Sequence, residues 1–93
     1  MNKDTAIEIQ RAEALTEIII RLMINDYKAK GFTSLEIANN LGIHKSGMSR
    51  IKNGLYQLDL SRFLSICGMT GQDPIELIKR AETVYASTHK KHV

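Results

Sequence analysis

The sequence predicts an all-helical fold made of one domain. Apolar residues recur at helical spacing along most of the chain, and no alternating apolar-polar run is long enough to indicate a strand. The 93 residues include one proline; 43% are hydrophobic and 25% charged, which is typical of folded globular proteins. We therefore expect five helices in a single domain over residues 1–87, followed by a basic flexible tail over 88–93.

The first expected helix is the longest, spanning about residues 5–30 and ending at Gly31. Its main apolar face has the spacing of a buried helix face and consists of Leu15, Ile18, Ile19, Leu22 and Met23. Beside it lies a second apolar stripe, made of Ile9, Ile20, Ile24 and Tyr27. One small domain rarely covers two faces of one helix. Either a later helix or another subunit covers the second stripe, and the sequence leaves both open.

A short second helix is expected over about residues 34–41. Thr33 and Glu36 form a capping-box pair at its start, with the hydroxyl at the N-cap and the carboxylate three residues later. Its apolar residues are Leu35, Ile37, Ala38 and Leu41. Gly42 ends this helix and permits the positive φ that a sharp turn often requires.

A third helix is expected over about residues 44–53, closed by Gly54. Met48 and Ile51 are its inward candidates, and its other residues are mostly small or cationic. Core packing alone explains such a helix poorly.

Two further helices complete the predicted domain. The fourth follows Asp59 or Leu60 and ends at Gly68, with an apolar stripe made of Leu60, Phe63, Leu64 and Cys67. The fifth has Asp73 as its N-cap and Pro74 at its first position, and it frays near residue 87. Its stripe consists of Leu77, Ile78, Ala81, Val84 and Tyr85.

Positive charge is concentrated in the middle of the chain. The formal net charge is +3, and residues 37–58 contain no Asp or Glu but do contain Lys45, Arg50 and Lys52. An acid-free basic segment inside a folded chain indicates a polyanionic partner. The alternative is a solvated surface helix that happens to be basic.

No pattern of catalytic residues is present, so we expect no enzyme, no cofactor and no metal. Cys67 is the one cysteine, which excludes an internal disulfide. His89 and His92 fall in the expected tail, where a solvated segment is a simpler interpretation than a metal site. No apolar run approaches the ~20 residues of a membrane span, and no signal peptide is visible, so we expect a cytoplasmic protein without a membrane partner.

A short capped helix, a turn at Gly42 and a basic second helix predict a helix-turn-helix over about residues 33–53. This stretch resembles the lambda-repressor and Cro-like helix-turn-helix family. The matching residues are Ala38, Gly42 with aliphatic Ile43, Met48 as the anchor, and Asn53 with Gly54. Residues 63–67 and 73–78 are similar to the family's fourth and fifth helices. The resemblance implies a five-helix DNA-binding domain, here with an extended first helix and with Ser34 where the family commonly has glutamine.

A looser resemblance links the chain to the lambda-type phage lysogeny activators. The shared features are the early Glu13-Ala14-Leu15 and the Lys-Ser-x-x-Ser-Arg-x-Lys pattern over residues 45–52. That resemblance implies a tetramer acting on direct repeats, with RNA polymerase as a further partner.

Site residues follow from the expected recognition helix. The residues expected to contact DNA base edges are Lys45, Ser46 and Ser49. The residues expected to contact phosphates are Thr33, Ser34, Arg50, Lys52, Asn53 and Tyr56. Ordinary helix capping is the alternative for Thr33, Ser34 and Asn53, and an ion pair with Glu36 is the alternative for Arg50.

These patterns predict a sequence-specific regulator of transcription that binds double-stranded DNA, as a homodimeric repressor of phage or mobile-element type. One recognition helix reads few base pairs, so an oligomer supplies the remaining affinity. The expected oligomer interface consists of Ile20, Ile24, Tyr27, Val84 and Tyr85. The alternatives are a tetrameric phage-type activator and an antitoxin-like or adaptor module whose main partner is a protein.

Overall fold

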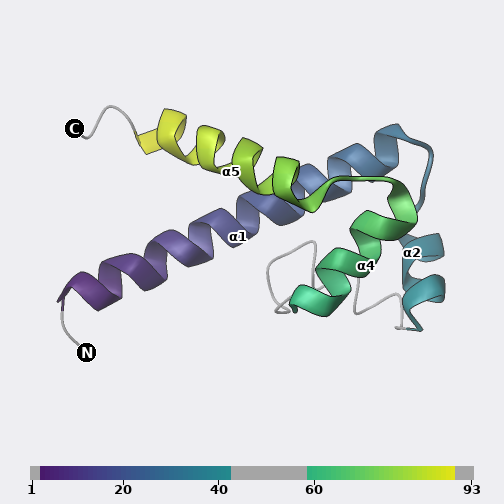
Figure 1. The fold of residues 1–93 in the computed structure, drawn as a ribbon, viewed down its shortest axis with the longest axis horizontal. Coiled ribbons are helices and arrows are strands. Elements are labelled where there is room, and N and C mark those ends of the chain that lie inside the picture. Colours follow the sequence, from purple (N-terminus) through teal and green to yellow (C-terminus); the bar gives the residue numbers. More distant parts are fainter. Residues whose placement is uncertain (1–2, 43–58, 90–93) are drawn as a thin grey trace.

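The structure is a computed structural model that describes residues 3–42 and 59–89 (Figure 1). Within these ranges the helices are α1 (Lys3–Ala29), α2 (Ser34–Leu41), α4 (Leu60–Thr70) and α5 (Pro74–His89). The all-helical fold class is confirmed. The five-helix count is not matched, because the described residues form four helices and the expected third helix lies outside them.

Local stop and start signals set most helix boundaries. The Asp59 carboxylate accepts from the Arg62 amide at 2.7 Å to start α4, and the Asp73 carboxylate accepts from the Ile75 amide at 3.0 Å at the start of α5. Both side chains satisfy helix-terminal amides that have no partner within the helix. The expected stop of α4 at Gly68 is wrong, since α4 continues to Thr70. Its C-cap is Gly71, in the left-handed region at φ 68°.

The second apolar stripe of α1 lies in the core of this chain. Ile20, Ile24 and Tyr27 are 6%, 7% and 0% exposed, and they belong to one buried cluster with side chains of α2, α4 and α5. Placing these three residues at an oligomer interface is therefore wrong, because later helices of the same chain cover them. On the expected main face, Met23 is fully buried. Its other members, Leu15, Ile18, Ile19 and Leu22, are half-buried.

Both apolar faces of α1 contribute to one buried cluster. Met23 of the main face belongs to the same cluster as Ile20 and Tyr27, and Ile19 and Leu22 pack against it. Helix α5 packs along α1, and α2 and α4 lie beside the C-terminal part of α1 (Figure 1).

Charged contacts join α1 to α5. Arg80 donates to the Asp26 carboxylate at 2.6 Å, and Arg11 lies 3.6 Å from Glu82 and 5.7 Å from the centre of the Tyr85 ring. These charged side chains are between 31% and 54% exposed, so each ion pair contributes about 1 kcal/mol or less.

Most of the packing of α5 comes from a narrow apolar strip. Leu77 and Ala81 are buried, Tyr85 is half-buried, and Ile78 and Val84 are 40% and 41% exposed. The helix continues through residue 89, past the expected fraying point near residue 87.

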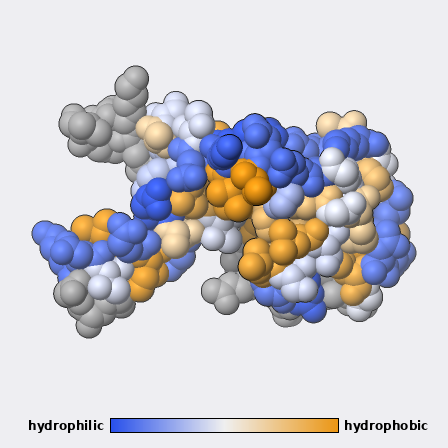
Figure 2. All heavy atoms as spheres, in the orientation of Figure 1, coloured by the Kyte–Doolittle hydropathy of each residue, from blue (hydrophilic) through white to orange (hydrophobic). Residues whose placement is uncertain are grey.

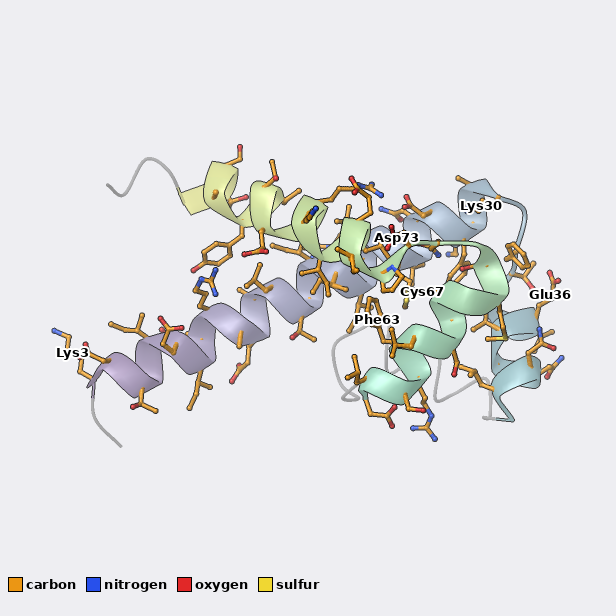
Figure 3. All side chains as sticks on the ribbon, viewed as in Figure 1. Lys3, Lys30, Glu36, Phe63, Cys67 and Asp73 are labelled. Atoms are coloured by element: carbon orange, nitrogen blue, oxygen red, sulfur yellow. The ribbon has the colours of Figure 1, made fainter. Side chains whose placement is uncertain are left out.

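Polar contacts hold the end of α4 against α1. The Lys30 ammonium donates to the carbonyl oxygens of Thr70 at 3.1 Å and Gly71 at 2.9 Å (Figure 3). The Gln72 amide nitrogen donates to the Thr70 hydroxyl at 2.9 Å and to the Met23 carbonyl at 3.3 Å. A cation at the C-terminus of a helix is also favoured by the helix dipole. Sequence reasoning missed this contact, because some forty residues separate Lys30 from the carbonyls that it caps.

Candidate nucleic-acid interface

The first turn of α2 is fixed by a reciprocal capping box, as the sequence predicts. The Thr33 hydroxyl accepts from the Glu36 amide at 3.1 Å, and the Glu36 carboxylate accepts from the Thr33 amide at 3.1 Å. The same carboxylate also accepts from the Thr33 hydroxyl at 3.0 Å. Helix α2 therefore begins where the sequence places it, at Ser34, with the Glu36 amide capped by the Thr33 hydroxyl.

Two kinds of contact orient α2 on the body of the molecule. Ile37 and Ala38 are fully buried, and the Tyr27 hydroxyl forms a 2.8 Å hydrogen bond with the Ser34 hydroxyl. Burial raises the pKa of Tyr27 above its ordinary value of 10.0, and the hydrogen bond with Ser34 partly offsets that rise. The neutral phenol of Tyr27 thus links the core to the start of α2.

Helix α2 ends in the sharp turn that the sequence predicts. Gly42 has φ 70° and ψ 27°, and its amide donates to the Ala38 and Asn39 carbonyls. This left-handed conformation costs other L-residues free energy. The chain therefore enters residues 43–58 directly from a fixed turn.

Two of the nine expected DNA contacts lie within the described residues. Thr33 is exposed and Ser34 half-buried, and their hydroxyl groups bond to Glu36 and Tyr27, respectively. A phosphate at this helix end would meet the Glu36 carboxylate. The geometry thus gives Thr33 a capping role and Ser34 an anchoring role. The other seven expected contacts lie outside the described residues: Lys45, Ser46, Ser49, Arg50, Lys52, Asn53 and Tyr56.

The possible ion pair between Arg50 and Glu36 also involves a residue outside the described ranges. Within them, the Glu36 carboxylate contacts Thr33, as described above. A pairing with Arg50 therefore stays a prediction.

The described residues and the rest of the chain differ in charge. Residues 3–42 and 59–89 contain eight Lys and Arg but all ten Asp and Glu of the chain. The remaining five cations lie in residues 43–58 and 90–93. The positive excess of the chain therefore comes entirely from these two segments, and the first of them directly follows the turn at Gly42.

Other chemistry finds little support in the described residues. Cys67 is 1% exposed, and burial, with a smaller contribution from Asp73, raises its thiol pKa, which suits a packing role and not a nucleophile. Among residues 3–42 and 59–89 there is no cluster of three or more His, Cys, Asp or Glu side chains that could hold a metal ion. In the same part of the chain, every helix is too short or too polar to cross a membrane.

No family model, curated protein or solved structure matches this chain.

Proposed function

We propose that this chain is a sequence-specific DNA-binding regulator of transcription, acting as a homo-oligomer. The observation that carries the proposal is a capped α2 that ends at Gly42 in a fixed left-handed turn, followed at once by an acid-free segment with three cations. A short anchored helix, a tight turn and a basic second helix form the arrangement by which helix-turn-helix proteins present side chains to the major groove.

The packing of α2 supports this role. Ile37, Ala38 and the Tyr27–Ser34 hydrogen bond fix α2 on α1 and α4. A recognition helix needs such a rigid support, since base readout depends on placing a few side chains accurately. In the proposal, Lys45, Ser46 and Ser49 read base edges, and the phosphate contacts come mainly from Arg50, Lys52, Asn53 and Tyr56.

Regulation in this proposal is repression by a homodimer. Repression follows from occupancy of an operator, and a dimer doubles the contacts that one short recognition helix provides. The tetrameric activator with RNA polymerase as a partner is the alternative within the same binding class, and half-site geometry separates the two.

Selection of bound DNA from a random pool tests the proposal. We expect the full chain to enrich a short motif repeated as an inverted pair, with half-sites about one helical turn apart. Direct repeats would favour the tetrameric activator. A pool that shows no enriched motif would contradict sequence-specific DNA binding.

A second candidate function, an adaptor whose main partner is a protein, is favoured by the exposed apolar residues of α4 and α5. Leu60, Leu64 and Ile75 are 69%, 47% and 63% exposed. Stable complexes with a second protein that form equally well with and without DNA would support the adaptor.

A further inference from the structure

Glu36 is the one charged residue of the sequence between Lys30 and Gly42. Its side chain is exposed on the outer side of α2 (Figure 3), where Figure 2 shows hydrophilic residues. In the described part of the chain, no lysine or arginine forms an ion pair with its carboxylate. Lys30 donates instead to the carbonyl oxygens of Thr70 and Gly71. The start of α2 therefore carries one negative charge that no described cation offsets.

The Glu36 carboxylate lies at the end of α2 that would otherwise attract an anion. Amide groups and the helix dipole favour negative charge at a helix N-terminus. Here the carboxylate accepts from the Thr33 amide at 3.1 Å and from the Thr33 hydroxyl at 3.0 Å. In the same turn, the Ser34 hydroxyl bonds to Tyr27 at 2.8 Å. An incoming phosphate would therefore meet a negative charge and two hydroxyl groups that already have partners.

The proposed function places this end of α2 near DNA phosphates. In a helix-turn-helix, the first helix crosses the DNA backbone while the second enters the major groove. Helix α2 is the first helix of the proposed pair, so Glu36 brings negative charge towards the backbone. The resulting repulsion acts on every sequence, because all duplexes have the same phosphates. The inference below rests on the proposed function for this orientation of α2.

Capping by itself does not require the charge of Glu36. A glutamine at the third position of a capping box also bonds to the N-cap amide. The carboxylate adds a favourable interaction with the helix dipole, which is small at an exposed position. Towards a phosphate, however, the two side chains differ by a full elementary charge.

We propose that Glu36 limits the affinity of this chain for DNA by keeping phosphate groups away from the N-terminus of α2. Phosphate contacts carry no sequence information, so a helix end that repels phosphate removes a contribution that all sequences share. A larger share of the binding free energy then comes from base contacts. Glu36 weakens specific and non-specific binding by a similar factor, and binding depends on the contacts proposed for residues 43–58.

Glu36→Gln tests the proposal, because it removes the charge and keeps an oxygen that can accept from Thr33. Fluorescence anisotropy of the full chain measures its affinity for the selected duplex and for a shuffled one. At about 50 mM salt, we expect the variant to bind both duplexes about two- to fivefold more tightly per subunit. The gain should shrink as salt is raised, since exposed charges are screened.

Thermal denaturation of the same variant separates this role from a purely structural one. Glu36→Gln should have an equal or slightly lower melting temperature, because a carboxylate is favoured at a helix N-terminus. Tighter DNA binding by a protein that is no more stable cannot come from a better-formed α2.

Glu8→Gln is the matched control for the change in net charge. Glu8 is an exposed acid near the start of α1, about 30 Å along that helix from the end that leads to α2. This distance is several Debye lengths at physiological salt. The control variant should therefore bind both duplexes as wild type does.

The ion pair that the sequence allows between Glu36 and Arg50 is tested in the same assay. The gain from Glu36→Gln should persist in an Arg50→Gln background, because the repulsion does not pass through Arg50. A gain that vanishes there overturns the proposal in favour of the ion pair. A folded Glu36→Gln variant that binds DNA no more tightly than wild type also overturns it and leaves the proposed function intact. Failure of both proteins to bind any duplex would contradict the proposed function itself, and the inference with it.

Discussion

Tyr27 combines complete burial with a polar contact at the start of α2. Its ring is in the core and its hydroxyl bonds to Ser34 at 2.8 Å. Tyr27→Phe keeps the ring but leaves the Ser34 hydroxyl without this partner. We expect the free energy of unfolding at pH 7 to fall by about 0.5–1.5 kcal/mol, as measured by urea denaturation. An unchanged value would contradict the linking role of Tyr27.

The same variant makes a pH-dependent prediction. Because burial raises the pKa of Tyr27 above 10.0, the unfolded chain loses this proton at lower pH than the folded chain does. The stabilisation from the neutral phenol is complete below pH 10 and is lost as pH rises through the folded-state pKa. The advantage of wild type over Tyr27→Phe should therefore shrink above pH 10. Parallel stability curves for the two proteins would show that Tyr27 is not protected from ionisation.

Lys45 and Lys52 have different expected roles at the DNA. Lys45→Ala should cost about 1–3 kcal/mol per half-site and relax the preference at one base position, since a base contact is lost. Lys52→Ala is the matched control: loss of a phosphate contact should weaken all sequences alike and lower the salt slope by about one per subunit. Affinities for a panel of single-base variants measure both. A Lys45→Ala variant with unchanged base preference would make Lys45 a phosphate contact.

The residues that could be predicted from the sequence are those whose role depends on near neighbours. Thr33 with Glu36, and Asp73 before Pro74, form caps within four residues, so local spacing was enough to find them. Tyr27 could not be placed in this way. Helical spacing shows that it shares a face with Ile20 and Ile24, but only the packing of α2 and α4 decides whether this chain or another covers that face.

At the scale of elements, the α2 turn is the feature that positions the proposed recognition segment. Gly42→Ala forces an alanine into the left-handed conformation, although its Cβ has space. We expect a loss of about 1–2 kcal/mol in unfolding free energy and weaker DNA binding. Gly42→Asn is the control, since asparagine tolerates this conformation better, and it should retain more stability. Equal stability of wild type and Gly42→Ala, by thermal denaturation, would mean that the turn is not fixed.

The stripe of Ile20, Ile24 and Tyr27 on α1 is buried within this chain, so a charged substitution in it should unfold the protein. At a subunit interface the same substitution would only separate the subunits. Ile24→Glu places a carboxylate in the core, where we expect more than about 3 kcal/mol of destabilisation and loss of helical circular dichroism. Ile9→Glu is the control on the same stripe, because Ile9 is 43% exposed and should accept the change. A folded but monomeric Ile24→Glu variant would instead place Ile24 at a subunit interface.

Two glycines explain why the sequence predicts too early an end for α4. Gly68 and Gly71 both follow the apolar residues of α4, and sequence alone gives each the same stop signal. In the structure, Gly71 adopts the left-handed conformation, while Gly68 continues the helix. Lys30 donates to the Thr70 and Gly71 carbonyls and so supports the later stop. A contact between residues forty positions apart has no local signature.

For the whole molecule, the distribution of charge determines how DNA affinity depends on salt. Residues 3–42 and 59–89 contain more acidic than basic residues, and residues 43–58 and 90–93 provide the positive excess. If each subunit neutralises about four phosphates, a dimer engages about eight, and log K against log salt should have a slope near −7. Fluorescence anisotropy with labelled duplex at several salt concentrations measures this slope. Binding that does not respond to salt would contradict contact through Lys45, Arg50 and Lys52.

The central claim is that this chain reads a DNA sequence. The most direct measurement is the affinity of the full chain for its selected site against a shuffled duplex of the same composition, at physiological salt. The account predicts a preference of at least about 10³-fold for the selected site, because base contacts add to a phosphate attraction that both duplexes share. Equal affinity for the two duplexes would contradict it.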